Sequence, residues 1–246
     1  MLYKKCLLAV CLAIVVCQSF AQAKTVKKML SPSLVESYTV LKSNKYVKEG
    51  SYMVTDADNH VLVLGHYKNG KKDSIWNFMD AAGNVIQQYN YTDSALLLNN
   101  PDNNTIVQAD YKLTDVNNSG KIDAPAQVGG ANYGFYLLYD LKSVPPQVLN
   151  QTAVVKMTYN FDIDKSGKVK GCTVTYKGAG IDLTEAIPAK KFMDEAYTFL
   201  PARVDGQPVE SNLLYTVDVN ISKSRLPKQY TSPTSDGAKM SQGIYH

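Results

Sequence analysis

Residues 155–163 read Val-Lys-Met-Thr-Tyr-Asn-Phe-Asp-Ile, with an apolar side chain at every odd position and a polar one at every even position. This strict alternation predicts a β-strand that buries one face. Residues 164–168 contain Gly167 and form a predicted turn, after which residues 169–176 alternate again. We therefore expect a hairpin, with a β-bulge at Gly171, where the apolar positions shift onto Cys172.

The next segment has the features of a helix followed by a last strand. Asp182 and Glu185 have the spacing of a helix-capping pair, and Pro188 suits a first helical turn. An apolar stripe at helical spacing follows, at Ala189, Phe192, Met193 and Ala196. The final strand is predicted from alternate apolar residues, which are Leu213, Tyr215, Val217, Val219 and Ile221. The expected order is strand, strand, helix, strand.

Residues 125–222 resemble the C-terminal domain of TonB-family energy transducers. The resemblance is carried by Tyr197-x-Phe199-x-Pro201-Ala202 and then Gly206-x-Pro208-Val209, ahead of the alternating strand. It implies a periplasmic two-layer domain that contacts outer-membrane transporters by pairing an extended peptide along a sheet edge. Such pairing is physically general, because an edge strand offers free N–H and C=O groups. The candidate partner-binding edge is the strand at 213–221.

An earlier segment, residues 46–91, resembles MORN-like repeats and belongs to a predicted antiparallel β domain over 46–113. Gly50-x-Tyr52 and Gly65-x-Tyr67 share a spacing, and Asn69-Gly70 precedes Trp76 and Phe78. Asn-Gly is a strong signal for a type I′ hairpin turn, since both positions need positive φ. Short strands are predicted at 51–55, 61–67, 75–79 and 85–91, and a further one at 105–113. The resemblance implies an antiparallel meander of stacked hairpins.

The N-terminal residues have the order of a secretory signal peptide. Lys4 and Lys5 precede an apolar run, and Ala21-x-Ala23 supplies a small-residue cleavage site. Three of the 4 cysteines (Cys6, Cys11 and Cys17) lie in this segment, so cleavage leaves Cys172 alone and excludes internal disulfides. We expect a periplasmic or otherwise exported protein of a Gram-negative bacterium, with no membrane span after cleavage. Retention of the segment as an anchor, or lipid attachment at Cys17, is the alternative.

Residues 115–123 imitate part of a calcium-binding loop. The candidate ligands are Asp115, Asn117, Ser119 and Asp123, but Ala126 stands where the loop needs a bidentate Glu. Calcium is therefore the alternative to the expectation of no cofactor. No nucleophile elbow, phosphate loop or pair of catalytic carboxylates can be recognised by spacing, so an enzyme is not expected. The near-balanced charge does not favour nucleic acid as a partner.

The sequence thus predicts an α+β protein. Its expected parts are a signal peptide (1–23), a linker or marginal first strand (24–45), a MORN-like antiparallel β meander (46–113), a connector (114–124), a TonB-C-like strand-strand-helix-strand domain (125–222) and a disordered tail (223–246). The expected function is recognition of an envelope protein or extended peptide, with an outer-membrane transporter as one candidate. The alternatives are a TonB-type energy transducer, if residues 1–23 are retained, and a calcium-stabilised structural surface protein.

Overall fold

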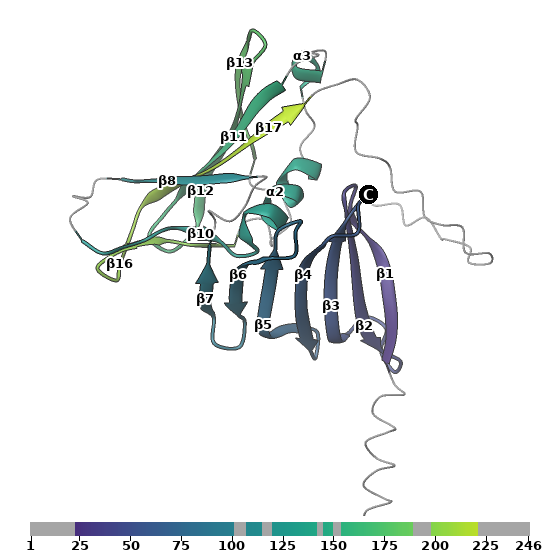
Figure 1. The fold of residues 1–246 in the computed structure, drawn as a ribbon. Helices are drawn as coiled ribbons and strands as arrows, with labels where there is room; N and C mark the ends of the chain where they lie inside the picture. The colour runs from purple at the N-terminus through teal and green to yellow at the C-terminus, as the bar shows by residue number, and fades with distance from the viewer. Residues whose placement is uncertain are drawn as a thin grey trace, which may run out of the picture.

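The computed structural model describes residues 23–100, 107–114, 120–141, 145–149, 154–188 and 198–220. They form mostly antiparallel β-sheet with few helices, as the α+β prediction requires in outline (Figure 1). A seven-stranded sheet contains β1 (Ala23–Ser31), β2 (Leu34–Leu41), β3 (Lys48–Asp56), β4 (Val61–Lys68), β5 (Lys71–Met79), β6 (Val85–Asn90) and β7 (Ala95–Asn99). A five-stranded sheet contains β8 (Gln108–Leu113), β11 (Val154–Ile163), β12 (Val169–Gly178), β13 (Ile181–Ala186) and β17 (Ser211–Asn220).

The remaining elements are short, apart from one helix. Two small ladders pair β10 (Ala126–Gln127) with β14 (Phe199–Leu200), and β15 (Ala202–Val204) with both β9 (Ile122–Asp123) and β16 (Gln207–Val209). The helices are α2 (Gly130–Leu141) and α3 (Pro146–Leu149). No helix among the described segments is long and apolar enough to cross a membrane. The predicted tail (223–246) and all but the last residue of the predicted signal peptide lie outside the described residues.

The seven-stranded sheet is a continuous meander in which each strand pairs with the next along the chain. The predicted strands between residues 51 and 91 are β3 to β6, so these predictions are confirmed. Asn69 and Gly70 have φ angles of 52° and 77°, as a type I′ turn requires. Within this sheet the rings of Tyr52, Tyr67 and Trp76 lie 5.0 to 5.3 Å apart and form a continuous aromatic cluster.

Residues 24–45, expected as a linker or a marginal first strand, contain two full strands, β1 and β2. Leu34 and Val40 of β2 are buried in the sheet, at 0% and 1% exposure. Sequence patterning did not predict β2, because Glu36, a charged residue, occupies a buried position of this strand and is only 2% exposed. Its carboxylate is satisfied by Lys28 of β1 at 3.1 Å and Lys48 of β3 at 3.0 Å.

The buried Glu36 gives stability that depends on pH. Burial raises its pKa, but hydrogen bonds and charge interactions with Lys48 and Lys28 outweigh burial and leave the pKa below the ordinary value. The folded state therefore binds a proton less readily than the unfolded state. The stability from Glu36 is fully present above the unfolded pKa, and it is lost as pH falls through the folded pKa.

Glu36→Gln is accordingly expected to lower the free energy of unfolding by about 2 kcal/mol at neutral pH. The difference from the unmodified protein should shrink as the pH falls below about 4, as measured by urea unfolding across a pH series. Asp182→Asn is the matched control, because its carboxylate pairs with Lys177 at an exposed site. A Glu36→Gln penalty that is constant between neutral and acidic pH would contradict this origin of the stability.

In the five-stranded sheet the order is β13-β12-β11-β17-β8. The β11–β12 hairpin is confirmed, and its register shifts next to Gly171, where the bulge was predicted.

The capping prediction for Asp182 and Glu185 is wrong, because both lie in β13, which pairs with β12. Turn residues Ala179 and Gly180, with φ of 54° and 78°, return the chain into a strand before any helix can begin. The helix predicted over 189–196 lies outside the described residues.

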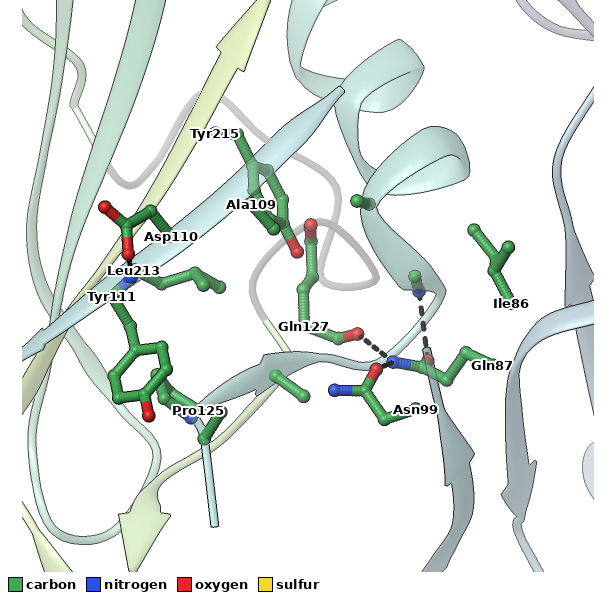
Figure 2. Close-up of a pocket in the computed structure, with 14 residues that line it drawn as sticks. Ile86, Gln87, Asn99, Ala109, Asp110, Tyr111, Pro125, Gln127, Leu213 and Tyr215 are labelled. Atoms are coloured by element: carbon green, nitrogen blue, oxygen red, sulfur yellow. Dashed lines mark hydrogen bonds between the residues drawn. The ribbon is translucent and has the colours of Figure 1, made fainter. Parts of the chain in front are cut away.

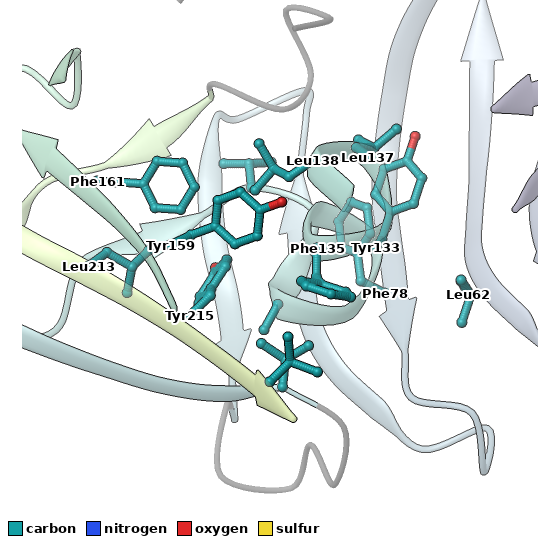
Figure 3. Close-up of a cluster of buried hydrophobic side chains, with 14 of the residues drawn as sticks. Leu62, Phe78, Tyr133, Phe135, Leu137, Leu138, Tyr159, Phe161, Leu213 and Tyr215 are labelled. Atoms are coloured by element: carbon teal, nitrogen blue, oxygen red, sulfur yellow. The ribbon is translucent and has the colours of Figure 1, made fainter. Parts of the chain in front are cut away.

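Helix α2 joins the two sheets into one core (Figure 3). Tyr133 stacks on Phe78 of β5 at 6.2 Å, and Phe135 meets Tyr159 of β11 edge-on at 6.2 Å. Leu137 and Leu138 are both 0% exposed. The helix is apolar on several sides because it contacts a sheet on each of two faces, which removes the amphipathic pattern that sequence reasoning depends on. No helix was predicted here.

Candidate functional site

Strand β17, predicted as the partner-binding edge, is an interior strand for most of its length. It pairs with β11 from Val154↔Asn220 to Ile163↔Ser211, and with β8 from Gln108 to Leu113. Leu213, Tyr215 and Val217 are 4%, 3% and 9% exposed, and Val219 is partly buried against the core. The edge assignment, made for residues 213–221, is therefore wrong over 213–216, where β8 occupies that side, and Ile221 lies outside the described residues.

Among the residues that the structure describes, the edges of the five-stranded sheet are β13 and β8. The sequence placed β8 with the first domain because it follows that domain along the chain. In the structure it crosses to the second sheet and covers β17 (Figure 1). Local patterning cannot specify this pairing, which joins residues about a hundred positions apart in the sequence. The free edge is thus displaced by one strand from its predicted position.

A cavity of about 300 Å³, partly open to solvent, adjoins this edge. Its lining comes from both sheets and from the start of α2, and Figure 2 shows these side chains converging on it. The lining residues are Ile86, Gln87, Asn99, Ala109, Asp110, Tyr111, Ala124, Pro125, Ala126, Gln127, Gly130, Ala131, Leu213 and Tyr215. The volume is at the lower end of the range for small-molecule sites, and it suits a single side chain with water.

The cavity's rigid floor is Gln87 of β6, which is 1% exposed. Its Nε2 donates to Asn99 Oδ1 at 3.0 Å and to the Gln127 carbonyl at 2.9 Å. Its Oε1 accepts from the backbone N–H groups of Gly129 at 2.8 Å and Gly130 at 3.0 Å. One side chain therefore binds β7, β10 and the N-terminus of α2 and uses its full hydrogen-bonding capacity.

Two hydrogen bonds set the polarity of the cavity wall. Because Asn99 accepts from Gln87 through Oδ1, its amide nitrogen lies on the other side, toward Pro125 in Figure 2. Burial raises the pKa of Tyr215, and a hydrogen bond from the Gln127 backbone opposes this only partly. The phenol therefore stays neutral and keeps its proton available for donation. Together with the apolar Ile86 and Leu213, the wall suits a neutral side chain that carries an acceptor.

The other predicted chemical residues are not brought together. Asp123 lies in β9, half exposed, with Lys121 Nζ 3.9 Å from its Oδ1. Asp115, Asn117 and Ser119 lie outside the described residues. The parts of the chain that the structure describes contain no group of three or more His, Cys, Asp or Glu placed to hold a metal ion. Cys172 is buried, and burial raises the pKa of its thiol to about 12, so it is not a thiolate at neutral pH.

A scan against protein-family models, a search of curated proteins and a search of solved structures found no match to this chain. The resemblances to the TonB C-terminal domain and to MORN-like repeats therefore stay predictions. The described residues place an edge strand, β8, beside a cavity.

Proposed function

We propose that this protein is a cell-envelope module that binds an extended segment of a partner protein. The segment adds as a strand to the free edge of β8, and one of its side chains lies over the cavity. The observation that carries the proposal is that the free edge and the cavity adjoin the same strand. Edge pairing supplies affinity through main-chain hydrogen bonds, and a side-chain pocket supplies selectivity.

The ladder geometry decides which backbone groups of β8 face outward. Thr114 N–H donates to the Glu210 carbonyl, which makes 114 and 210 a hydrogen-bonded pair. Antiparallel pairs alternate, so Gln108, Asp110 and Lys112 bond to β17, and the N–H and C=O groups of Ala109, Tyr111 and Leu113 point away from it. These three residues are the groups that an added strand would bind.

Side chains of β8 that lie along its edge also line the cavity. Ala109 is opposite Tyr215 and Tyr111 is opposite Leu213, so these four side chains share one face of the sheet. All four line the cavity. Since side chains alternate along a strand, an added segment would direct every second side chain to this face. A side chain beside Ala109 and Tyr111 is thereby positioned to reach the cavity.

Asp110 protects this edge in the free protein. Its Oδ1 accepts a hydrogen bond of 2.7 Å from Tyr111 N–H, one of the outward groups. A charged side chain on an edge strand is a common device against uncontrolled pairing. A partner must displace the Asp110 carboxylate, which favours a segment that supplies a carbonyl oxygen in its place. The N-terminal order of Lys4, Lys5, an apolar run and Ala21-x-Ala23 supports export as the setting.

The test is selection from a phage-displayed library of random linear peptides on the purified protein, followed by affinity measurement on selected peptides. Ala109→Pro removes an outward N–H, while the hydrogen bonds of β8 to β17 come from other residues. It is expected to weaken peptide binding at least tenfold while the circular dichroism spectrum and melting temperature are retained.

Lys112→Ala is the matched control, since its exposed side chain is lost and its backbone still bonds to β17. It should bind the selected peptides within about twofold of the unmodified protein. Full peptide affinity in a folded Ala109→Pro variant would rule out pairing at this edge. Failure to select any peptide would argue against the function itself.

A further inference from the structure

The seven-stranded sheet has one end where exposed lysines gather. Hairpin loop 42–47 carries Lys42 and Lys45, and turn 68–71 carries Lys68 and Lys71; all four are exposed, and neither segment contains an acidic residue. The two segments are adjacent, because Gly70 N–H donates to the Lys48 carbonyl at 2.9 Å. We refer to these four lysines with Lys24 and Tyr46 as the basic end.

The start of β1 belongs to the same end. Ala23 pairs with Leu41 and Lys24 with Val40, so β1 begins beside the loop that carries Lys42 and Lys45. In Figure 1 this is the lower end of the sheet. The chain therefore enters the fold at the basic end, and the apolar sequence 6–16 precedes this point along the chain.

The opposite end of the sheet has the opposite character. The turns there contain Asp56, Asp58 and Asp80. Three carboxylates also lie toward the basic end: Glu49 accepts from the Asn69 N–H, and Asp73 and Asp93 belong to the next hairpin. The exposed lysines of the turns thus gather at one end of the sheet, whereas the turns of the other end carry Asp58 exposed and Asp56 and Asp80 buried.

An exposed aromatic residue lies among the lysines. Tyr46 is 85% exposed, and the Lys45 ammonium lies 5.4 Å from the centre of its ring. Aromatic side chains with a polar tip prefer the boundary between headgroups and acyl chains, and lysines near an anionic bilayer are attracted to it. Lysines around an exposed tyrosine are therefore complementary to such a surface.

We propose that the basic end docks onto an anionic lipid bilayer. This inference does not rest on the peptide-binding function. Asn99 and Ile86, which line the cavity, lie at the other end of β7 and β6, so docking would leave the cavity and the edge of β8 facing away from the lipid. The protein would then present its peptide-binding edge to partners from a membrane surface.

The test is flotation of the full chain with vesicles of phosphatidylcholine alone, or mixed with phosphatidylglycerol, at low and high salt. Each neutralised lysine is expected to weaken anionic-vesicle binding about fivefold. Changing Lys42, Lys45, Lys68 and Lys71 together to Gln should therefore reduce it roughly a hundredfold or more. Tyr46→Ser should reduce it several-fold, and high salt should abolish the preference for anionic vesicles.

The matched control changes four exposed lysines outside the basic end, Lys112, Lys121, Lys165 and Lys168, to Gln. It has the same net charge and should retain anionic-vesicle binding within a few-fold. Binding to pure phosphatidylcholine measures any contribution from residues 1–22, which all variants share. Equal losses in the two quadruple variants, no preference for anionic vesicles, or binding to heparin without binding to vesicles would each overturn the proposal.

Discussion

Replacing Gln87 with leucine is expected to lower the free energy of unfolding by about 4 kcal/mol. The leucine side chain has nearly the same size but leaves the N–H groups of Gly129 and Gly130 without their acceptor. The Gln127 carbonyl and Asn99 Oδ1 also lose their donor. Each buried group left unsatisfied costs about 1 to 3 kcal/mol, although the partly open cavity allows water to reach some of them. Urea unfolding measures the loss.

Gln88→Leu provides the comparison for Gln87. Gln88 is the next residue of β6, only partly buried, with one hydrogen bond of 2.7 Å to Asn77 Oδ1. Its replacement should cost less than about 1 kcal/mol. Because Gln87 also holds the cavity wall, its loss should weaken peptide binding even where the variant stays folded. A Gln87→Leu variant as stable as Gln88→Leu would show that this hydrogen-bond cluster does not hold α2 to the first sheet.

Gly65→Ala is expected to destabilise the protein by about 3 kcal/mol, through overpacking of the aromatic cluster. A Cβ at residue 65 would lie 2.3 Å from two atoms of the Trp76 ring. The ring cannot easily move, since its Nε1 donates to the carbonyls of His66 and Asp73, each at 3.2 Å. Tyr52, Tyr67 and Tyr91 also contact it at ring separations of 5.0 to 5.3 Å. Thermal or urea unfolding reports the effect.

The control for Gly65 is Gly171→Ala, in the five-stranded sheet. Nothing lies within 4 Å of a Cβ added at Gly171, and its φ is outside the left-handed region. This change should alter stability by about 0.5 kcal/mol at most. Similar stabilities for the two alanine variants would contradict the role assigned to Gly65, namely to make room for Trp76.

The hairpins could be predicted from the sequence because their determinants are local. Alternation over 155–163 and 169–176 fixes which face is buried, and Asn69-Gly70 supplies the positive φ values of its turn. Gly171 was informative for the same reason, since a bulge changes the apolar parity within a few residues. These features do not depend on which distant segment completes the sheet.

The partners of the strands could not be predicted, because they depend on contacts between distant residues. Nothing near β8 indicates that it pairs with β17, so the edge was assigned one strand too far inward. Glu36 lies in a buried strand position only because lysines on both neighbouring strands neutralise it. Gln87 binds groups some forty residues away in sequence. The cavity is built from such contacts. The strands predicted at 85–91, 105–113 and 213–221 all line it, but their convergence on one cavity was not predicted.

The two proposed surfaces lie at different ends of the molecule and depend on different forces. The basic end depends on charge and should respond to salt. The edge of β8 depends on directional main-chain hydrogen bonds, which salt affects little. A salt series on peptide binding and on vesicle binding therefore separates them. Loss of vesicle binding at high salt with peptide binding intact would show that the two surfaces act independently.

Capture of an extended segment at β8 is best tested by amide hydrogen exchange of the protein with and without a selected peptide. Strand addition predicts new protection at the outward N–H groups of Ala109, Tyr111 and Leu113. The amides of Gln108, Asp110 and Lys112, already bonded to β17, should change less. Protection confined to β13, β7 or β1, with none in β8, would contradict capture at this edge.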